Sequence, residues 1–361
     1  MTSEIEIRTE IEPIAGEWDG LADRLGAAPS MYSGWIAVWQ RWFGSGELAI
    51  VCVRDRGELT GLLPVVRRRG AISSPANWHT PSFEPLAASP ETSTQLVRAA
   101  LASRPHRLDF AFVYADSAQL ELCGTAAQAL RYHTVSRVIE RSPYVKIDTD
   151  WQAFEAALPS RRRSKLRRFR RRLEERGSIA IELERGGREL GPMLAEGFAI
   201  EASGWKGERG TAINSRPETK GFYEEIARWA AERGWLRLWF LRLDGRVIAF
   251  AFCLEHAGRQ YELKVGFDTD YASNGPGILL TRARLEHSFE AGLKSYEFLG
   301  QAEKHKLDWT DHCRELARLQ AFAPTVAGQA SRLAWTRGRA AALKARELAR
   351  RAQRQASADE S

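Results

Sequence analysis

Two stretches of the chain repeat one pattern, with their turn glycines, Gly57 and Gly245, 188 positions apart. Residues 48–69 (LAIVCVRDRGELTGLLPVVRRR) and 236–256 (LRLWFLRLDGRVIAFAFCLEH) each carry apolar runs on both sides of a short turn. Glycine supplies the positive φ that a tight hairpin turn requires. An aromatic-rich stretch of helical character precedes each hairpin. The repeat predicts two copies of one α/β domain in tandem; two unrelated hairpins are the alternative.

The second copy continues in a regular order. The sequence predicts a strand at 259–267 (RQYELKVGF), a glycine-proline loop at 268–277, a helix at 278–292 and a short strand at 294–300. We therefore expect a mixed α/β (α+β) fold with two mostly antiparallel sheets flanked by helices. The expected domains are residues 1–150 and 151–325, followed by a basic helical tail at 326–361.

Composition limits the class of protein. The 361 residues are 44% hydrophobic and include 12 Trp, enough to build packed cores. The polar, acidic start lacks the pattern of a secretion signal, and no apolar stretch approaches the roughly 18 residues of a membrane span. The four cysteines lie far apart without a C-x-x-C pair. We expect a cytoplasmic protein without disulfides or a metal site.

The net charge of +7 is concentrated in two segments, residues 161–177 and the tail from 326. In the first, Leu166, Phe169 and Leu173 form one apolar stripe at helical spacing, with Ser160 as the expected N-cap and Gly177 as the stop. The pattern predicts a docked helix and disfavours a free nucleic-acid arm. Its basic face is either solvated or a rim that attracts phosphates.

The sequence NGPG (274–277) between a strand and a helix is a layout that binds phosphate. A helix start exposes unpaired N–H groups and the positive end of the helix dipole. Glycines let the backbone approach an anion closely, and proline fixes its own φ.

The second half resembles the GNAT-type acetyltransferases, most closely the subgroup described as CelD/BcsL-like, which is linked by name to cellulose biosynthesis. The resemblance covers roughly residues 15–322, with its specific motifs in GFD…PG, YEFLG and K-x-x-W. The Fem-type aminoacyl transferases are relatives of this group.

The resemblance implies acetyl-CoA as donor, no metal, and an amine as acceptor. It places backbone groups of Val265, Gly266 and Phe267 against the pantetheine. It places the pyrophosphate on residues Asn274, Gly275, Gly277 and Ile278. Two positions depart from the pattern: the loop is shortened to NGPG, and His305 stands where the subgroup often has Tyr.

Charged residues within the strand YELKVGF are the first catalytic candidates. Regular alternation would place Glu262 and Lys264 on one face, where Glu262 could act as a base through a water and Lys264 could bind an acidic group of the substrate. Glu297 in the next strand could lie near Glu262, and Tyr296 could protonate the leaving thiolate. A surface ion pair and a core tyrosine are the alternatives.

Three further residues are candidates for the acceptor side. Lys306, beyond the closing strand, could bind a carboxylate or phosphate, and Trp205 with Lys206 could form one wall of the acceptor site. The equivalent region of the first half, residues 77–89 (NWHTPSFEPLAAS), contains no glycine, so we expect that half to lack a CoA site of its own.

Three functions remain open. The first is an N-acyltransferase that moves acetyl from acetyl-CoA to a small amine, such as a sugar or polysaccharide precursor. The second is a Fem-like transferase that takes its donor from charged tRNA, the one alternative in which a nucleic acid is a partner. The third is a non-catalytic binding module built on a degenerate pair of such domains.

Overall fold

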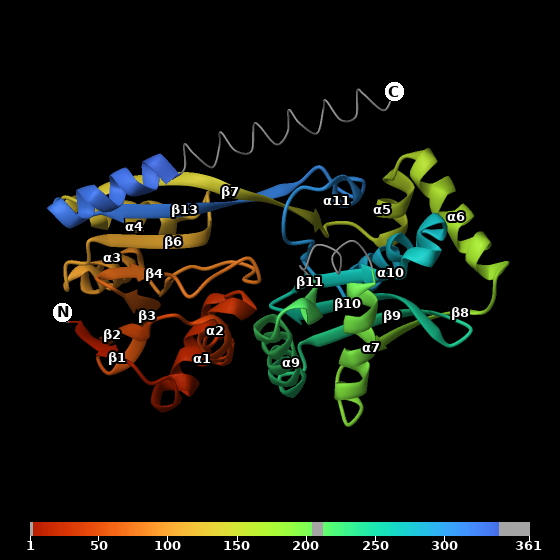
Figure 1. Ribbon diagram of the computed structural model, residues 1–361, viewed down its shortest axis with the longest axis horizontal. Helices are drawn as coiled ribbons and strands as arrows, with labels where there is room; N and C mark the ends of the chain where they lie inside the picture. The colour runs from red at the N-terminus through yellow and green to blue at the C-terminus, as the bar shows by residue number, and fades with distance from the viewer. Residues whose placement is uncertain (1–2, 204–211, 339–361) are drawn as a thin grey trace.

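The computed structural model describes residues 3–203 and 212–338, and within them the strands form one 13-stranded sheet that runs through both halves of the chain (Figure 1). The strand order is β1-β2-β3-β4-β6-β13-β7-β12-β11-β10-β9-β8, and β5 pairs with β3 beside this path. Most neighbours are antiparallel; β4 with β6 and β11 with β12 are parallel. The expected mixed α/β class with helices flanking mostly antiparallel sheet is confirmed.

Both halves use the same order of elements, except that two short strands, β4 and β5, follow the hairpin of the first half where β11 follows that of the second. The first half contains β1 (Glu4–Arg8), α1 (Ala15–Leu25), α2 (Ser33–Phe43), β2 (Glu47–Asp55), β3 (Glu58–Arg68), β4 (Ala71–Ser73), β5 (Leu86–Ala87), α3 (Pro90–Leu101), β6 (Arg107–Tyr114), α4 (Ala118–Ala129) and β7 (His133–Lys146). After the linking helices α5 (Trp151–Ala157) and α6 (Ser160–Glu174), the second half contains β8 (Ile179–Glu184), α7 (Leu190–Ala202), α9 (Pro217–Glu232), β9 (Leu236–Leu243), β10 (Arg246–His256), β11 (Arg259–Phe267), α10 (Pro276–Glu290), β12 (Ser295–Glu297), α11 (Lys304–Leu307) and β13 (Cys313–Phe322). Four short 3₁₀ turns are η1 (Glu12–Ile14), η2 (Pro29–Met31), η3 (Ile213–Ser215) and η4 (Thr269–Asn274).

The predicted hairpins are present as β2–β3 and β9–β10, and each follows its predicted helix, α2 or α9. The strand predicted at 259–267 is β11. The helix predicted at 278–292 begins two residues earlier, because Pro276 occupies its first turn. The strand predicted at 294–300 is only β12, because the backbone turns at Leu299 (φ 50°) and Gly300 (φ 66°), which ends the ladder.

Two long strands join the halves. β7 pairs with β13 along its first part and with β12 at its C-terminal end, so it belongs to both parts of the sheet (Figure 1). β13 lies between β6 and β7, although it is the last strand of the second half in sequence. We expected residues 151–325 to form the second domain. The last strand of this range, β13, completes the sheet of the first half.

The sheet of the second half has two covered faces. Along β9, Leu238 and Phe240 pack in the core beneath α7 and α9, while Trp239 and Leu241 pack in a separate core beneath α6 and α10. This alternation follows from the period of two in a strand. A side chain on β11 can therefore be assigned to one face by the helix it contacts.

Helices α2 and α9 pack closely across the boundary between the halves. A Cβ atom on Gly34 would lie 2.1 Å from Nε1 of Trp229, and one on Gly221 would lie 2.2 Å from Cη2 of Trp42. Any larger residue would push the helices apart. This close contact between α2 and α9 holds the first half beside the C-terminal end of β11.

Helix α6 confirms the docked interpretation of the arginine-rich segment, since Leu166, Phe169 and Leu173 are buried. Ser160 is not its N-cap: the helix starts at Ser160 itself, and Pro159 takes the capping position without a side-chain hydrogen bond. At the other end of the chain, residues 326–338 are helical. None of the helices among the described residues is both long and apolar enough to cross a membrane.

Candidate active site

The site forms where two strands separate. β11 and β12 pair in parallel only over Arg259–Tyr261 and Ser295–Glu297. Beyond Tyr261, β11 runs on along β10 while the chain after β12 turns away. The gap opens into a pocket of about 500 Å³, lined by β11, the start of α10, the 298–306 segment and a loop of the first half. The gap exposes the part of β11 that contains Val265, Gly266 and Phe267, the residues that the resemblance places against the pantetheine.

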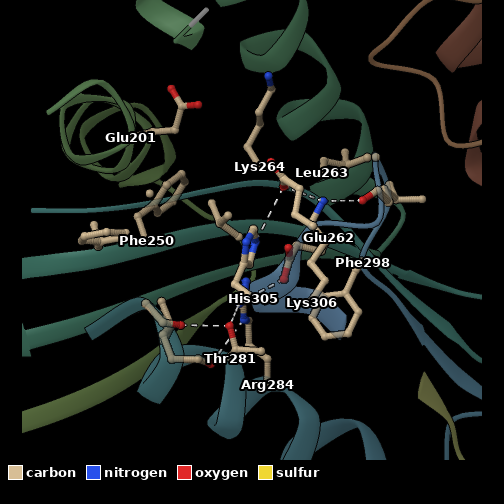
Figure 2. Close-up of a pocket in the computed structure, with 18 of the residues that line it drawn as sticks. Glu201, Phe250, Glu262, Leu263, Lys264, Thr281, Arg284, Phe298, His305 and Lys306 are labelled. Carbon is tan, nitrogen blue, oxygen red and sulfur yellow. Dashed lines mark hydrogen bonds and ion pairs between the residues drawn. The ribbon is translucent and has the colours of Figure 1, made fainter. Parts of the chain in front are cut away.

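A β-bulge reverses one prediction about β11. Phe252 pairs with Lys264 and Cys253 with Glu262, so Leu263 is an extra residue. Glu262 therefore contacts α10, while the Lys264 ammonium lies 5.4 Å from the ring centre of Tyr223 on α9. The expectation that both share one face is wrong, because the extra residue breaks the alternation. Figure 2 shows Lys264 extending away from Glu262 and Arg284.

Glu262 is held on one side only. Its Oε2 accepts a hydrogen bond from the Tyr296 hydroxyl (2.6 Å) and lies 3.0 Å from Nη2 of Arg284. No hydrogen bond to the other oxygen, Oε1, is present within the described part of the chain, and Glu262 lines the pocket. Arg284 also donates to Thr281 Oγ1 (2.8 Å), so the buried guanidinium is fixed from several directions. The network orients one carboxylate oxygen and leaves the other for a ligand or water.

Tyr296 is fully buried, and burial raises its pKa well above the usual value for tyrosine. Its hydroxyl proton is donated to Glu262, and Tyr296 does not line the pocket. Glu297 lies elsewhere: Ser295 Oγ donates to it (2.6 Å), and Arg314 binds both of its oxygens. The structure thus brings Tyr296 to Glu262 and directs Glu297 to β13.

The start of α10 forms one end of the pocket. Gly275 caps the helix in the left-handed conformation (φ 61°), followed by Pro276 and Gly277. A Cβ atom on Gly275 would lie 2.4 Å from the ring of Phe169 in α6, and one on Gly277 would lie 3.2 Å from the Phe267 ring. Position 275 therefore requires glycine, whereas a side chain at position 277 would need the Phe267 ring to shift.

The remaining residues predicted to bind the cofactor divide into two groups. Val265, Gly266 and Ile278 line the pocket. Asn274 does not; it is buried, and its Oδ1 accepts a hydrogen bond from Arg176 (3.2 Å). Asn274 therefore ties the end of α6 to the loop instead of contacting the pocket.

Lys306 lines the pocket but its ammonium is already engaged. Nζ donates to the carbonyl oxygens of Leu299 (2.8 Å) and Gln301 (3.3 Å) and lies 3.3 Å from Glu303. These contacts hold the turn that follows β12. Trp205 and Lys206, the other acceptor-side candidates, lie outside the described residues.

Two residues that sequence reasoning missed also line the pocket. Glu140 on β7 is buried, and burial raises the pKa of its carboxyl. His79 comes from the loop between β4 and β5, and its Nδ1 lies 3.2 Å from the Tyr223 hydroxyl. Burial lowers the pKa of the imidazole to about 3, and the charge of Lys264 contributes a smaller decrease. Neither stands in a recognisable motif, because both reach the pocket only through contacts between the halves.

The basic residues of α6 fall on two flanks. Arg161, Lys165, Arg168, Arg172 and Arg176 recur at intervals of three or four residues along one flank, and Arg176 lies over Tyr271 beside the glycine loop. Lys165 and Arg168 lie against the Phe169 ring that contacts Gly275. None of the first four has a carboxylate partner in the part of the chain that the structure describes, whereas Arg170 on the other flank pairs with Glu174.

Among the described residues, no group of three or more His, Cys, Asp or Glu side chains is placed to hold a metal ion.

Comparisons with known proteins support the assignment of the fold. The structure is similar to FemX (TM-score 0.59, 14% identity, 89% of this chain and 97% of that one). It is also similar to the C-terminal domain of a protein described as a lysylphosphatidylglycerol synthetase from Agrobacterium fabrum (TM-score 0.55, 14% identity, 89% and 95%). A conserved protein of unknown function from Bacteroides thetaiotaomicron gives a TM-score of 0.56 at 9% identity, covering 88% and 100%. At these identities the similarity shows a shared fold.

A comparison with curated protein sequences finds no match. The family model of the acetyltransferase (GNAT) domain matches residues 160–307, from the start of α6 to the end of α11. This range contains the separated strands, the glycine-lined helix start and Glu262. Residues 160–307 therefore carry the sequence pattern of an acetyltransferase (GNAT) domain.

Proposed function

We propose that the protein is an N-acyltransferase that transfers an acetyl group from acetyl-CoA to an amine, and that it belongs to the CelD/BcsL-like subgroup. The observation that carries this proposal is the gap between β11 and β12, which ends at a helix start lined by Gly275 and Gly277. A pantetheine arm fits a gap that exposes strand backbone, and a diphosphate fits a helix start that begins with the glycines Gly275 and Gly277.

The residues present suit the donor. In this proposal, backbone groups of Val265, Gly266 and Phe267 bind the pantetheine, and those of Gly275, Gly277 and Ile278 bind the diphosphate. Asn274 supports the loop through Arg176. The flank of α6 beside the loop supplies cations for the phosphates of the nucleotide.

Glu262 acts as the general base, directly or through one water. The amine nitrogen attacks the thioester carbon and gives a tetrahedral intermediate. Its excess proton passes to Oε1 of Glu262, and the C–S bond breaks. The CoA thiolate leaves and takes a proton from water, and Glu262 returns its own proton to water. Tyr296 and Arg284 position the carboxylate from the other oxygen. Tyr296 is thus a positioning residue, since its proton is directed to Glu262 and not to the leaving group.

The acceptor enters from the side of the first half. Lys264, His79 and the exposed Trp78 line that side of the pocket. A neutral imidazole, an ammonium and an exposed indole suit a polar acceptor that carries an anionic group, such as an amino sugar or a polysaccharide precursor.

The direct test has two steps. Isothermal titration with acetyl-CoA should show saturable binding, and release of the CoA thiol should then depend on an added amine such as glucosamine. Binding without thiol release across a panel of amines would leave a non-catalytic binding module, and no binding at all would refute the proposal.

Charge reversal on α6 tests where the nucleotide lies. Lys165→Glu with Arg168→Glu should weaken acetyl-CoA binding by about tenfold or more, since each charge-assisted hydrogen bond is worth roughly 1.5–3 kcal/mol. Arg163→Glu with Arg167→Glu, on the opposite flank, is the matched control and should leave the Kd unchanged. Equal effects from the two pairs would indicate general electrostatic attraction.

A transferase that takes its donor from charged tRNA is the second candidate. The unpaired basic flank of α6 and the fold shared with FemX favour it. Salt-sensitive binding of tRNA together with no binding of acetyl-CoA would select this function.

A further inference from the structure

The first half contains a counterpart of the cleft described above. When the two hairpins are superposed through their turn glycines, β3 corresponds to β10. β5 then takes the position of β11, because Ala87 pairs with Gly61 of β3 as Phe267 pairs with Ala249 of β10. In this correspondence Glu84 stands where the second half has Lys264. The duplication therefore reproduces the strand that forms the active-site pocket.

A cavity of about 420 Å³ lies at the equivalent place. The cavity is lined by the end of α1, residues 82–87 around β5, and the start of α4. The corresponding elements of the second half, the end of α7, β11 and α11, line the first pocket. Its volume falls in the range of about 300–1,000 Å³ typical of small-molecule sites.

The helix start that follows β5 does not line this cavity, and it is closed to phosphate. Pro90 opens α3 as Pro276 opens α10, but Ser89 replaces glycine at the cap, and its hydroxyl accepts a hydrogen bond from the Thr92 N–H (3.2 Å). The side chain thus occupies a donor that a diphosphate would need. The second cleft calls for a different ligand.

Opposite charges face this cavity without touching. Ser117 hydrogen-bonds the Glu84 side chain, but one buried oxygen, Oε1, has no hydrogen-bond partner among the described residues, and burial raises the pKa of the carboxyl. Asp116 stands at the exposed edge of the same cavity. On the other side, the Arg259 guanidinium makes no ion pair with any described residue, whereas Arg314 is already paired with Glu297. This carboxylate oxygen of Glu84 can therefore accept a hydrogen bond from a ligand in the cavity.

We infer that this second cleft binds a small zwitterion of the α-amino-acid class, with its ammonium at Glu84 and its carboxylate at Arg259. A carboxylate suits a guanidinium because two N–H groups can bind it in parallel, and an ammonium supplies the donor that Oε1 lacks. Arg259 is the first residue of β11, so the ligand would lie at the origin of the active-site strand.

The experiment is a thermal-shift screen of the proteinogenic amino acids on the full chain, followed by calorimetric titration of the best one. Its decarboxylated analogue lacks the carboxylate and its deaminated analogue lacks the ammonium, so they are matched probes. Each should bind about tenfold more weakly or worse, because each loses a charge-assisted contact. Glu84→Gln, which keeps the shape of the side chain, and Arg259→Gln should weaken binding similarly. Glu47→Gln, at an exposed site, should not.

Three results would overturn the inference: no amino acid binds, an analogue binds as tightly as the parent, or Glu84→Gln leaves the affinity unchanged. Competition with acetyl-CoA would place the ligand in the first pocket and would also refute it. Acetyl-CoA is titrated into each variant in parallel. A failure of amino-acid binding at the second cleft is therefore distinguished from a failure of acetyl-CoA binding, on which the proposed acyltransferase function depends.

Discussion

Burial of His79 should make the protein sensitive to mild acid. The imidazole stacks on Phe43 with ring centres 5.3 Å apart, contacts the Tyr223 hydroxyl, and has a pKa of about 3 in the folded chain. In the unfolded chain its pKa is about 6.5. Between these values the unfolded state binds a proton that the folded state does not, so the free energy of unfolding falls as the pH falls below 6.5. From pH 7 to pH 5 the linkage relation gives a loss of about 2 kcal/mol from this residue.

The assay is urea unfolding at pH 7 and pH 5, followed by tryptophan fluorescence. His79→Gln removes the titrating group and keeps a side chain that can hydrogen-bond Tyr223, so its loss between the two pH values should be about 2 kcal/mol smaller than that of the wild type. His133→Gln, at an exposed position, is the control and should behave as the wild type. If His79→Gln and the wild type lose the same free energy, His79 titrates normally and the argument from burial fails.

Three further outcomes are expected. Glu262→Gln should lower kcat for amine-dependent thiol release by about 10²–10⁴-fold with acetyl-CoA affinity retained, and a loss below tenfold would exclude its role as base. Lys306→Met should lower the free energy of unfolding by about 1–3 kcal/mol, because it leaves carbonyl groups of the turn after β12 unpaired. If stability is unchanged and only the KM for the acceptor increases, Lys306 binds substrate instead. A fragment of residues 1–150 should fail to unfold cooperatively, since β6 and β7 lack β13 between them, and a sharp denaturant transition would contradict this.

The sequence predicted the local elements well because the signals for them are local. Hairpin turns, the NGPG helix start and the apolar stripe of α6 each depend on a few neighbouring residues, and all are present. The bulge at Leu263 left no such signal, since one extra residue in a strand changes no residue type. It nevertheless moved Lys264 to the opposite face from Glu262.

Residues whose partners lie far away in sequence were harder to predict. Glu297 looked like a neighbour of the catalytic strand, but Arg314 of β13 binds it, and the sequence did not indicate that β13 crosses to the first half. Arg284 lies in the predicted helix at 278–292 but stood in no motif, and only the packing shows that it is buried against Glu262. Long-range pairing of this kind is fixed by topology and not by local pattern.

The position of β13 also determines when the first half can fold during synthesis. β7 ends at Lys146, but the strand that fills the space between β6 and β7 ends only at Phe322. The ribosome must therefore add 176 more residues (322 − 146), which takes roughly 9–35 s at about 5–20 residues per second. During that interval two strand edges of the nascent chain stay open to wrong partners. The amino-terminal half is made first and completed last, so we expect folding to depend on how well those edges are protected until the end of translation.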